Sequence, residues 1–266
     1  MKKIPITQIT FDQQISGRHM RKFRGAVIES VMQLAPKFTE SGLSPDLFHN
    51  HKGPAPTEGE SRRSKGADRF YHYPKIQYQL RHGKAAIMGI GEGAHALQLW
   101  LSWVGDEFTV NDRPFSLAIA DHQQVFWQPT LGEKPTTYRI NKWLAFNASN
   151  HDEWKQTPRL QDKALLLDKR LWGHICHLFE GLDITMEKEN LELFVSTIDH
   201  QTYVDCYGIQ KLALDITFQT NLNLPAEIGL GQGTTAGYGK VQPIKTRPRI
   251  RKSTVSFQKD VVSTEE

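Results

Sequence analysis

Five glycines fall within eleven positions near the end of this 266-residue chain, at residues 229–239, in the order G-x-G-x-G-x-x-x-G-x-G. Glycine adopts positive φ without penalty and lets another backbone come close. We interpret this segment as a loop, the glycine loop, whose amide groups are able to surround an anion. An alternating strand pattern precedes it and a basic tail follows it, which favours a polyanion as the ligand.

Two familiar nucleotide-binding patterns do not fit the glycine loop. It lacks the Gly-Lys-Ser/Thr ending of a P-loop, and no helix of useful length follows it as a dinucleotide fingerprint requires. A tight turn region without any ligand remains an alternative.

Charge is unevenly distributed along the chain. Residues 1–84 hold 15 Lys and Arg against 7 Asp and Glu, and residues 236–266 hold 7 against 3, whereas residues 85–235 hold 11 against 19. Basic flanks around an acidic centre are typical of a protein that binds a phosphate backbone. Scattered surface charge is the alternative.

Composition narrows the class of protein. With 38% hydrophobic residues the chain is able to bury a core, and two cysteines, Cys176 and Cys206, provide neither a disulfide framework nor a cysteine-rich metal site. No apolar run approaches the roughly 20 residues of a membrane span, and the N-terminus lacks the apolar segment of a signal peptide. We therefore expect a cytoplasmic protein without a membrane partner.

The chain divides into two halves with a similar order of elements. The expected elements are strands at 4–11, 108–126, 138–146, 193–198, 212–218 and 241–244, helices at 26–34, 94–104 and 162–180, and a hairpin at 73–91 that turns at His82-Gly83. This order fits an α+β protein of two tandem ferredoxin-like (RRM-like) domains.

We place the N-terminal domain at residues 1–127 and the C-terminal domain at residues 128–252. The connection is expected in the Pro- and Gly-containing stretch 128–137, and residues 253–266 are expected to form a flexible tail.

His49 and His51 form a His-x-His pair in a basic segment. In extended backbone, residues two apart face the same side, so both imidazoles would reach one phosphodiester, and their pKa near neutrality suits acid–base catalysis. A solvated loop is one alternative. A metal site is another, although no Asp or Glu follows closely and no Cys completes a ligand set.

Together, the glycine loop and the ferredoxin-like pattern resemble the RAMP superfamily of CRISPR systems. Within it, the chain resembles the repeat-processing endoribonucleases. The segment 70–78, running on to 89–93, and the His-x-His pair upstream are similar to the subgroup that uses two histidines and a tyrosine. The resemblance covers residues 4–245.

The resemblance implies metal-independent cleavage of CRISPR repeat RNA by the neighbouring 2′-OH, leaving a 2′,3′-cyclic phosphate and a 5′-OH. It implies no cofactor and no metal. In this reading His49 and His51 are the catalytic pair, Lys52 holds the phosphate oxygens, and either Tyr71 or Tyr73 orients or donates. Which histidine is the base stays open.

Further residues are candidates for RNA binding because they are basic or lie in the glycine loop. They are Arg18, Arg21, Lys22 and Arg24 at the first helix, Gly229, Gly231, Gly233, Gly237, Tyr238, Gly239 and Lys240 in and beside the loop, and Arg247, Arg249 and Arg251 in the tail. His72, His174 and His177 are expected to be core or surface residues.

Two other functions are compatible with the same residues. One is a non-catalytic RNA-binding subunit of a CRISPR interference complex. The other is a metal-dependent nuclease or phosphohydrolase with His49 and His51 as ligands. The expected partner is precursor guide RNA, and both association with other interference subunits and a homodimer are left open.

Overall fold

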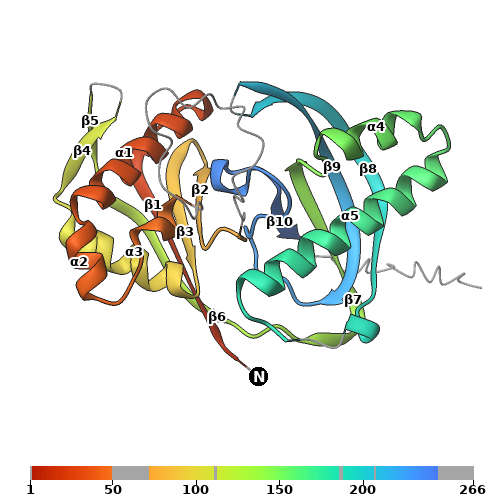
Figure 1. Cartoon of the computed structure of the whole chain (residues 1–266), viewed down its shortest axis with the longest axis horizontal. Coiled ribbons are helices and arrows are strands. Elements are labelled where there is room, and N and C mark those ends of the chain that lie inside the picture. The colour runs from red at the N-terminus through yellow and green to blue at the C-terminus, as the bar shows by residue number, and fades with distance from the viewer. Residues whose placement is uncertain (1, 50–71, 111–112, 186–187, 207, 245–266) are drawn as a thin grey trace, which may run out of the picture.

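Two four-stranded antiparallel sheets organise this chain, one in each half. The computed structural model describes residues 2–49, 72–110, 113–185, 188–206 and 208–244. The two sheets belong to two tandem ferredoxin-like domains that lie side by side (Figure 1). The predicted α+β fold class is therefore confirmed.

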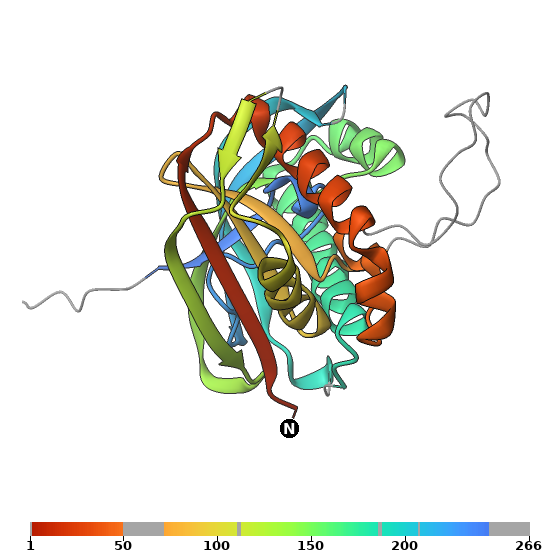
Figure 2. The ribbon, with the colours of Figure 1, turned by 90° about the vertical axis from the view of Figure 1, so that its left-hand side faces the viewer.

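The N-terminal sheet has the strand order β2-β3-β1-β6. Its elements are β1 (Ile4–Gln14), α1 (Met20–Gln33), β2 (Ile76–Arg81), β3 (Lys84–Ile90), α3 (Glu92–Trp103) and β6 (Ile119–Trp127). Between them lie η1 (Gly17–His19), α2 (Ala35–Glu40), η2 (Pro45–Phe48) and a small hairpin of β4 (Glu107–Val110) and β5 (Arg113–Ser116). Helices α1 and α3 cover the same face of the sheet (Figure 2).

Strand β1 is buried on both faces. Ile9 and Phe11 pack with α1 and α3, whereas Ile4 and Ile6 belong to a second cluster that includes the core of the C-terminal domain. Because a strand alternates its side chains between two faces, β1 contributes to both cores. The second domain thus covers the sheet face that the helices leave open.

The predicted hairpin forms as β2 and β3. Its turn residues His82 and Gly83 both have positive φ, 49° and 77°, as a two-residue turn that matches the twist of the strands requires. Glycine accepts this conformation freely. The turn fixes the register in which Arg81 pairs with Lys84.

The C-terminal sheet repeats the topology with the order β10-β7-β9-β8. Its elements are β7 (Leu131–Trp143), α4 (Ala148–Gln156), α5 (Leu160–Gly181), η3 (Lys188–Asn190), β8 (Leu193–Cys206), β9 (Ile209–Leu222), η4 (Thr234–Ala236) and β10 (Lys240–Pro243). The glycine loop, with the single turn η4, stands where the second helix of a ferredoxin-like unit would stand. The C-terminal domain therefore has a short loop, and not a second helix, between the two domains.

Some expected boundaries were wrong. β7 begins at Leu131, inside the stretch expected to be a connection, because the break that Pro135 introduces is absorbed by a register shift between Leu131 and Thr136. Residues 108–126 form a hairpin followed by β6 rather than one strand.

Two further elements escaped the sequence patterns. β8 continues to Cys206, beyond the expected end at residue 198, as an edge strand whose exposed polar side chains gave no hydrophobic signal. Helix α4 was not expected, since its residues are mostly polar. Within the described residues, no helix is long and apolar enough to cross a membrane.

Candidate active site

The glycine loop lies between the domains, beside β2 and α1 (Figure 1). Gly237 has φ +85°, and a Cβ added there would lie 3.0 Å from the backbone oxygen of Tyr78 in β2. A side chain at this position would therefore meet both backbone strain and the neighbouring strand. Glycine is required because the loop packs directly on the backbone of the other domain.

A closed set of buried hydrogen bonds fastens the start of the loop. The Tyr73 hydroxyl donates to the Gly229 carbonyl at 2.8 Å, and the Gln77 side-chain amide donates to the Tyr73 oxygen at 2.8 Å. The Gly229 amide in turn donates to the Gln77 side-chain oxygen at 2.9 Å. Burial raises the pKa of Tyr73 well above its usual range, more than the Gln77 hydrogen bond lowers it. Tyr73 thus stays protonated and acts as a support of the loop.

Most amide groups of the loop are used inside the protein. Amides that donate to protein acceptors belong to Gly229, Leu230, Gln232, Ala236, Gly237, Tyr238 and Gly239. The sequence suggested that successive amides would surround an anion. These seven do not do so, because the loop's close packing turns them toward carbonyls and one glutamine side chain.

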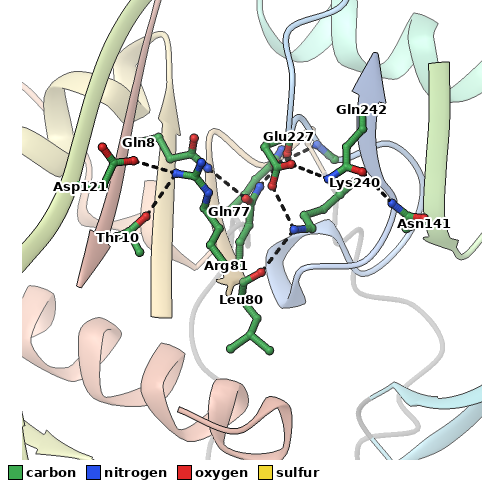
Figure 3. A network of polar contacts seen from close by, with 12 residues as sticks. Gln8, Thr10, Gln77, Leu80, Arg81, Asp121, Asn141, Glu227, Lys240 and Gln242 are labelled. Atoms are coloured by element: carbon green, nitrogen blue, oxygen red, sulfur yellow. Dashed lines mark hydrogen bonds and ion pairs between the residues drawn. The ribbon is translucent and has the colours of Figure 1, made fainter. Parts of the chain in front are cut away.

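A polar network continues from the loop across the domain boundary (Figure 3). The Lys240 ammonium lies 3.0 Å from a Glu227 carboxylate oxygen and donates to the Leu80 carbonyl at 3.3 Å. The Gln242 amide donates to the other Glu227 oxygen at 2.8 Å. Burial alone would raise the pKa of Glu227, but the Gln242 hydrogen bond, Lys240 and the charge of Arg81 together lower it.

The N-terminal side of this network comes from alternate residues of β1 and β2. Gln79 donates to the Glu227 carbonyl at 2.7 Å and accepts from Gln8 at 3.3 Å. Arg81 donates to Asp121 at 3.2 Å and to Thr10 at 3.3 Å.

Sequence reasoning missed these residues. A signal was present, since polar residues alternate with apolar ones, at Gln8 and Thr10 around Ile9 in β1 and at Gln77, Gln79 and Arg81 in β2.

His49 lies on the helix side of the same region. The Arg24 guanidinium donates to the His49 carbonyl at 3.2 Å, and the Tyr78 hydroxyl donates to the Phe48 carbonyl at 3.4 Å. Tyr78 is also the residue whose backbone lies against Gly237. The segment that carries His49 and the glycine loop therefore share Tyr78 as a neighbour.

The backbone of His49 differs from the expected extended form. It has φ −95° and ψ −29° at the end of η2, and its amide donates to the Asp46 carbonyl at 3.0 Å. Ser44 caps this turn and Pro45 opens it, and both residue types favour the start of a helical turn. Hence same-side placement of His49 and His51 does not follow from an extended strand at His49.

The remaining predicted site residues are placed as follows. Arg18, Arg21 and Lys22 are exposed at η1 and the start of α1, and Arg24 is half-buried. Tyr238 is half-buried and its hydroxyl donates to the Asp205 carbonyl at 2.8 Å. His51, Lys52, Tyr71, Arg247, Arg249 and Arg251 lie outside the described residues.

Two histidines of α5, His174 and His177, contact side chains that pack against the glycine loop. Trp143 donates to the His174 Nδ1 at 3.1 Å, and a Cβ on Gly231 would meet the same indole nitrogen at 2.7 Å. Burial first, then the charges of His177 and Arg170, lower the pKa of His174 to about 4. This imidazole is therefore neutral near pH 7 and acts as an acceptor in the core. His177 is half-buried, and its ring lies 6.2 Å from that of Tyr73.

Across the described ranges, no three His, Cys, Asp or Glu side chains gather where they could hold a metal ion.

Comparison with known families gives two matches in chain order. The Cas6b N-terminal domain matches residues 2–124, and the Cas6b C-terminal domain matches residues 130–244. Among curated proteins, the chain is 30% identical over 103 residues to an uncharacterized protein of Methanocaldococcus jannaschii, MJ0978. That match covers 38% of this chain and 67% of the relative.

Solved structures are similar over most of the chain. A crystal structure of Cas6b aligns with a TM-score of 0.71 at 20% identity, over 91% of this chain and 100% of that one. A second, described as the CRISPR RNA processing endoribonuclease Cas6b, aligns with a TM-score of 0.63 at 18% identity, over the same 91% and 100%. At these identities the likeness establishes the fold.

Proposed function

This chain belongs to the Cas6b family, and from that premise we propose that it cleaves CRISPR precursor transcripts within the repeat to give mature guide RNAs. One of its structural relatives is described as a CRISPR RNA processing endoribonuclease. The two family domains follow one another in the expected order along almost all of the described chain.

The contacts of Tyr78 relate the proposed function to one region of the molecule. Tyr78 contacts both the segment of His49, through the Phe48 carbonyl, and Gly237 of the glycine loop. His49, which carries a titratable imidazole, and a loop from the other domain thus belong to segments that share one neighbour, although they are far apart in sequence. An RNA strand that crosses the domain boundary here would meet both.

The chemistry that we propose needs no metal. Attack of the 2′-OH on the adjacent phosphate requires a base for its proton, an acid for the leaving 5′-oxygen and a cation for the phosphate charge. We assign the first two roles to His49 and His51 and the third to Lys52. Imidazole suits proton transfer near neutral pH, and such help is worth roughly 10²–10⁴ in rate.

The two candidate tyrosines have different parts in this proposal. Tyr73 is buried and its hydroxyl both donates to Gly229 and accepts from Gln77. It therefore serves by holding the glycine loop. Tyr71 is the tyrosine that we propose to contact the RNA.

RNA binding in this proposal depends on exposed cations beside the site. Arg18, Arg21 and Lys22 are exposed at the start of α1, the helix that also supplies Arg24 to the His49 carbonyl. Each phosphate contact releases counterions, so affinity should fall steeply with salt. A-form major grooves are too narrow for side chains, so phosphates and RNA shape would dominate recognition.

The deciding experiment incubates the protein with a labelled CRISPR repeat RNA in EDTA. The matched control substrate carries a 2′-deoxy sugar at the cleavage position. We expect cleavage of the first and none of the second, with 2′,3′-cyclic phosphate and 5′-OH ends. Activity that EDTA abolishes would favour a metal-dependent nuclease. Tight binding without cleavage would favour an RNA-holding subunit of an interference complex.

A further inference from the structure

A pocket of about 260 Å³ lies where α4 and the start of α5 cover the edge strand β8, and His49 is not one of its lining residues. Its lining residues come from four elements of the C-terminal domain, α4, α5, β8 and β9: His151, Trp154, Lys155, Lys163, Gln201, Thr202, Tyr203 and Leu212. Pockets for drug-sized ligands occupy roughly 300–1,000 Å³. This one suits a smaller planar group.

One wall of the pocket is aromatic. Tyr203 is 59% exposed, and its ring meets the His151 ring edge to face, at 6.2 Å between centroids. Trp154, a third ring of the lining, is buried and packs on Phe146 with 5.2 Å between the ring centroids. An exposed tyrosine ring that a neighbouring imidazole holds edge to face is a surface on which a flat ring is able to stack.

The other wall is cationic. Lys155 and Lys163 line the pocket, and no acidic side chain does. The Lys163 ammonium lies 4.7 Å from the centre of the Trp154 ring, which holds it in place without neutralising it. Lys155 lies 3.7 Å from Asp152, but both side chains are more than half exposed, so this pair is weak and exchangeable. The pocket thus favours an anion.

Polar groups that distinguish planar ligands lie between the two walls. The Nε2 atom of His151 is buried and has no hydrogen-bond partner among the described residues. Because this nitrogen has almost no accessible surface, His151 contributes its ring to the pocket wall rather than a hydrogen bond to a ligand. Gln201 and Thr202 add an amide and a hydroxyl on the same lining.

The pocket lies close to the glycine loop. The Tyr238 hydroxyl donates to the Asp205 carbonyl at 2.8 Å, and Tyr203 stands two residues before Asp205 on β8. At about 3.3 Å per strand residue, this separation is roughly 7 Å along the strand. A chain that leaves the glycine loop along β8 would reach the pocket directly.

We propose that this pocket binds one nucleotide of single-stranded RNA, with its base stacked on Tyr203 and its phosphate held by Lys155 and Lys163. The combination of an aromatic platform and a positive groove is how proteins hold single strands without reading a duplex. The proposal rests on the RNA-processing function proposed above. It adds a binding subsite on the C-terminal domain, whose lining includes neither His49 nor a residue of the glycine loop.

The first test measures the Kd of a repeat RNA that carries 2′-deoxy at the cleavage position. Loss of one stacked base costs about 1–3 kcal/mol, so Tyr203→Ala should weaken binding roughly 5- to 150-fold, whereas Tyr203→Phe should bind like the wild type. Phe194→Ala is the matched control, since Phe194 is an exposed aromatic of the same strand that does not line the pocket. Equal affinity of Tyr203→Ala and wild type would overturn the proposal.

A second variant tests the phosphate contact. Lys163→Met keeps an unbranched apolar stem over Trp154 but removes the charge, so the slope of log Kd against log salt should fall by about one. A variant that merely misfolds would lose its thermal transition, and one that only loosens α5 would leave the slope unchanged. An unchanged slope in a folded variant contradicts the assignment of Lys163.

Binding of an unrelated, unstructured ten-nucleotide RNA at low salt separates the two proposals. If the wild type neither binds nor cleaves the repeat but holds this RNA in a Tyr203-dependent manner, the proposed function fails and the pocket stands. If the repeat is cleaved and Tyr203→Ala changes neither RNA's affinity, the pocket fails and the function stands. Photocrosslinking of 5-iodouridine to Tyr203 would identify the bound nucleotide.

Discussion

The hydroxyl of Tyr73 donates a 2.8 Å hydrogen bond to the carbonyl of Gly229, and both residues are buried where the two domains meet. This bond joins Tyr73, which lies just before β2, to the first glycine of the glycine loop. With Gln77 it fixes the loop on the N-terminal domain. The position of the loop is therefore a property of both domains together.

Tyr73→Phe should destabilise the protein by about 1–3 kcal/mol, because the Gly229 carbonyl and the Gln77 amide lose a buried partner. Urea denaturation measures this change, and Tyr203→Phe, at an exposed position, is the control. The rate of RNA cleavage should also fall, because the glycine loop loses the hydrogen bond that holds it on the N-terminal domain. Full stability combined with complete loss of cleavage would instead identify Tyr73 as a catalytic group.

Gly237→Ala should weaken both stability and RNA cleavage. The substituted residue would have φ +85° and a Cβ 3.0 Å from the Tyr78 carbonyl oxygen. Gly208→Ala is the matched control, since Gly208 has φ +80° with no atom within 4 Å of an added Cβ. Both variants carry the strain of about 1–2 kcal/mol of a left-handed residue. If the midpoint of thermal unfolding and the cleavage rate change equally in Gly237→Ala and Gly208→Ala, the contact of Gly237 with β2 has no effect on either.

His49→Ala and His51→Ala should each lower the single-turnover cleavage rate by roughly 10²–10⁴ while leaving the Kd for repeat RNA almost unchanged. His19→Ala is a suitable control, because His19 is an exposed histidine of the same domain. Wild-type rates in both variants would remove the pair from the mechanism. A rate loss accompanied by an equal loss of affinity would indicate a binding role.

Acid should destabilise the fold through His174. Its folded pKa of about 4 lies below the usual histidine value of 6.5, so the unfolded chain binds the proton first as pH falls. The contribution of neutral His174 to the free energy of unfolding, about 3 kcal/mol, is therefore fully present above about pH 6.5 and is lost as the pH falls toward 4. His174→Gln can still accept from Trp143, and its urea midpoint should depend less on pH over this window. An equally steep dependence in the variant would contradict this origin.

Glu227→Gln should destabilise the protein at pH 7 by about 1–3 kcal/mol, because Lys240 loses its charged partner and keeps the uncharged Leu80 carbonyl. The lowered pKa of Glu227 means that this contribution is present above the usual carboxyl pKa and is lost as pH falls through the folded value. The difference in urea midpoint between wild type and variant should therefore shrink below about pH 4. Glu133→Gln, at an exposed position of β7, is the control.

Local features of the sequence were sufficient for much of the fold. The paired positive φ of His82 and Gly83, the alternation in β9 and the apolar stripe of α5 each follow from nearest-neighbour geometry. Positive φ at Gly231, Gly233, Gly237 and Gly239 is likewise what a glycine-rich segment predicts. Such features depend on a few consecutive residues, so the sequence alone displays them.

Tertiary structure decided what covers each face. Alternation in β2 shows that Gln77 and Gln79 share a side of that strand, but only packing of the second domain makes that side buried and links it to Glu227. In the same way, only the folded chain makes Tyr73 a support for Gly229 and turns the loop's amides inward. A periodic pattern encodes the direction of a side chain, whereas its partner comes from a distant segment, and long-range contacts leave no period in the sequence.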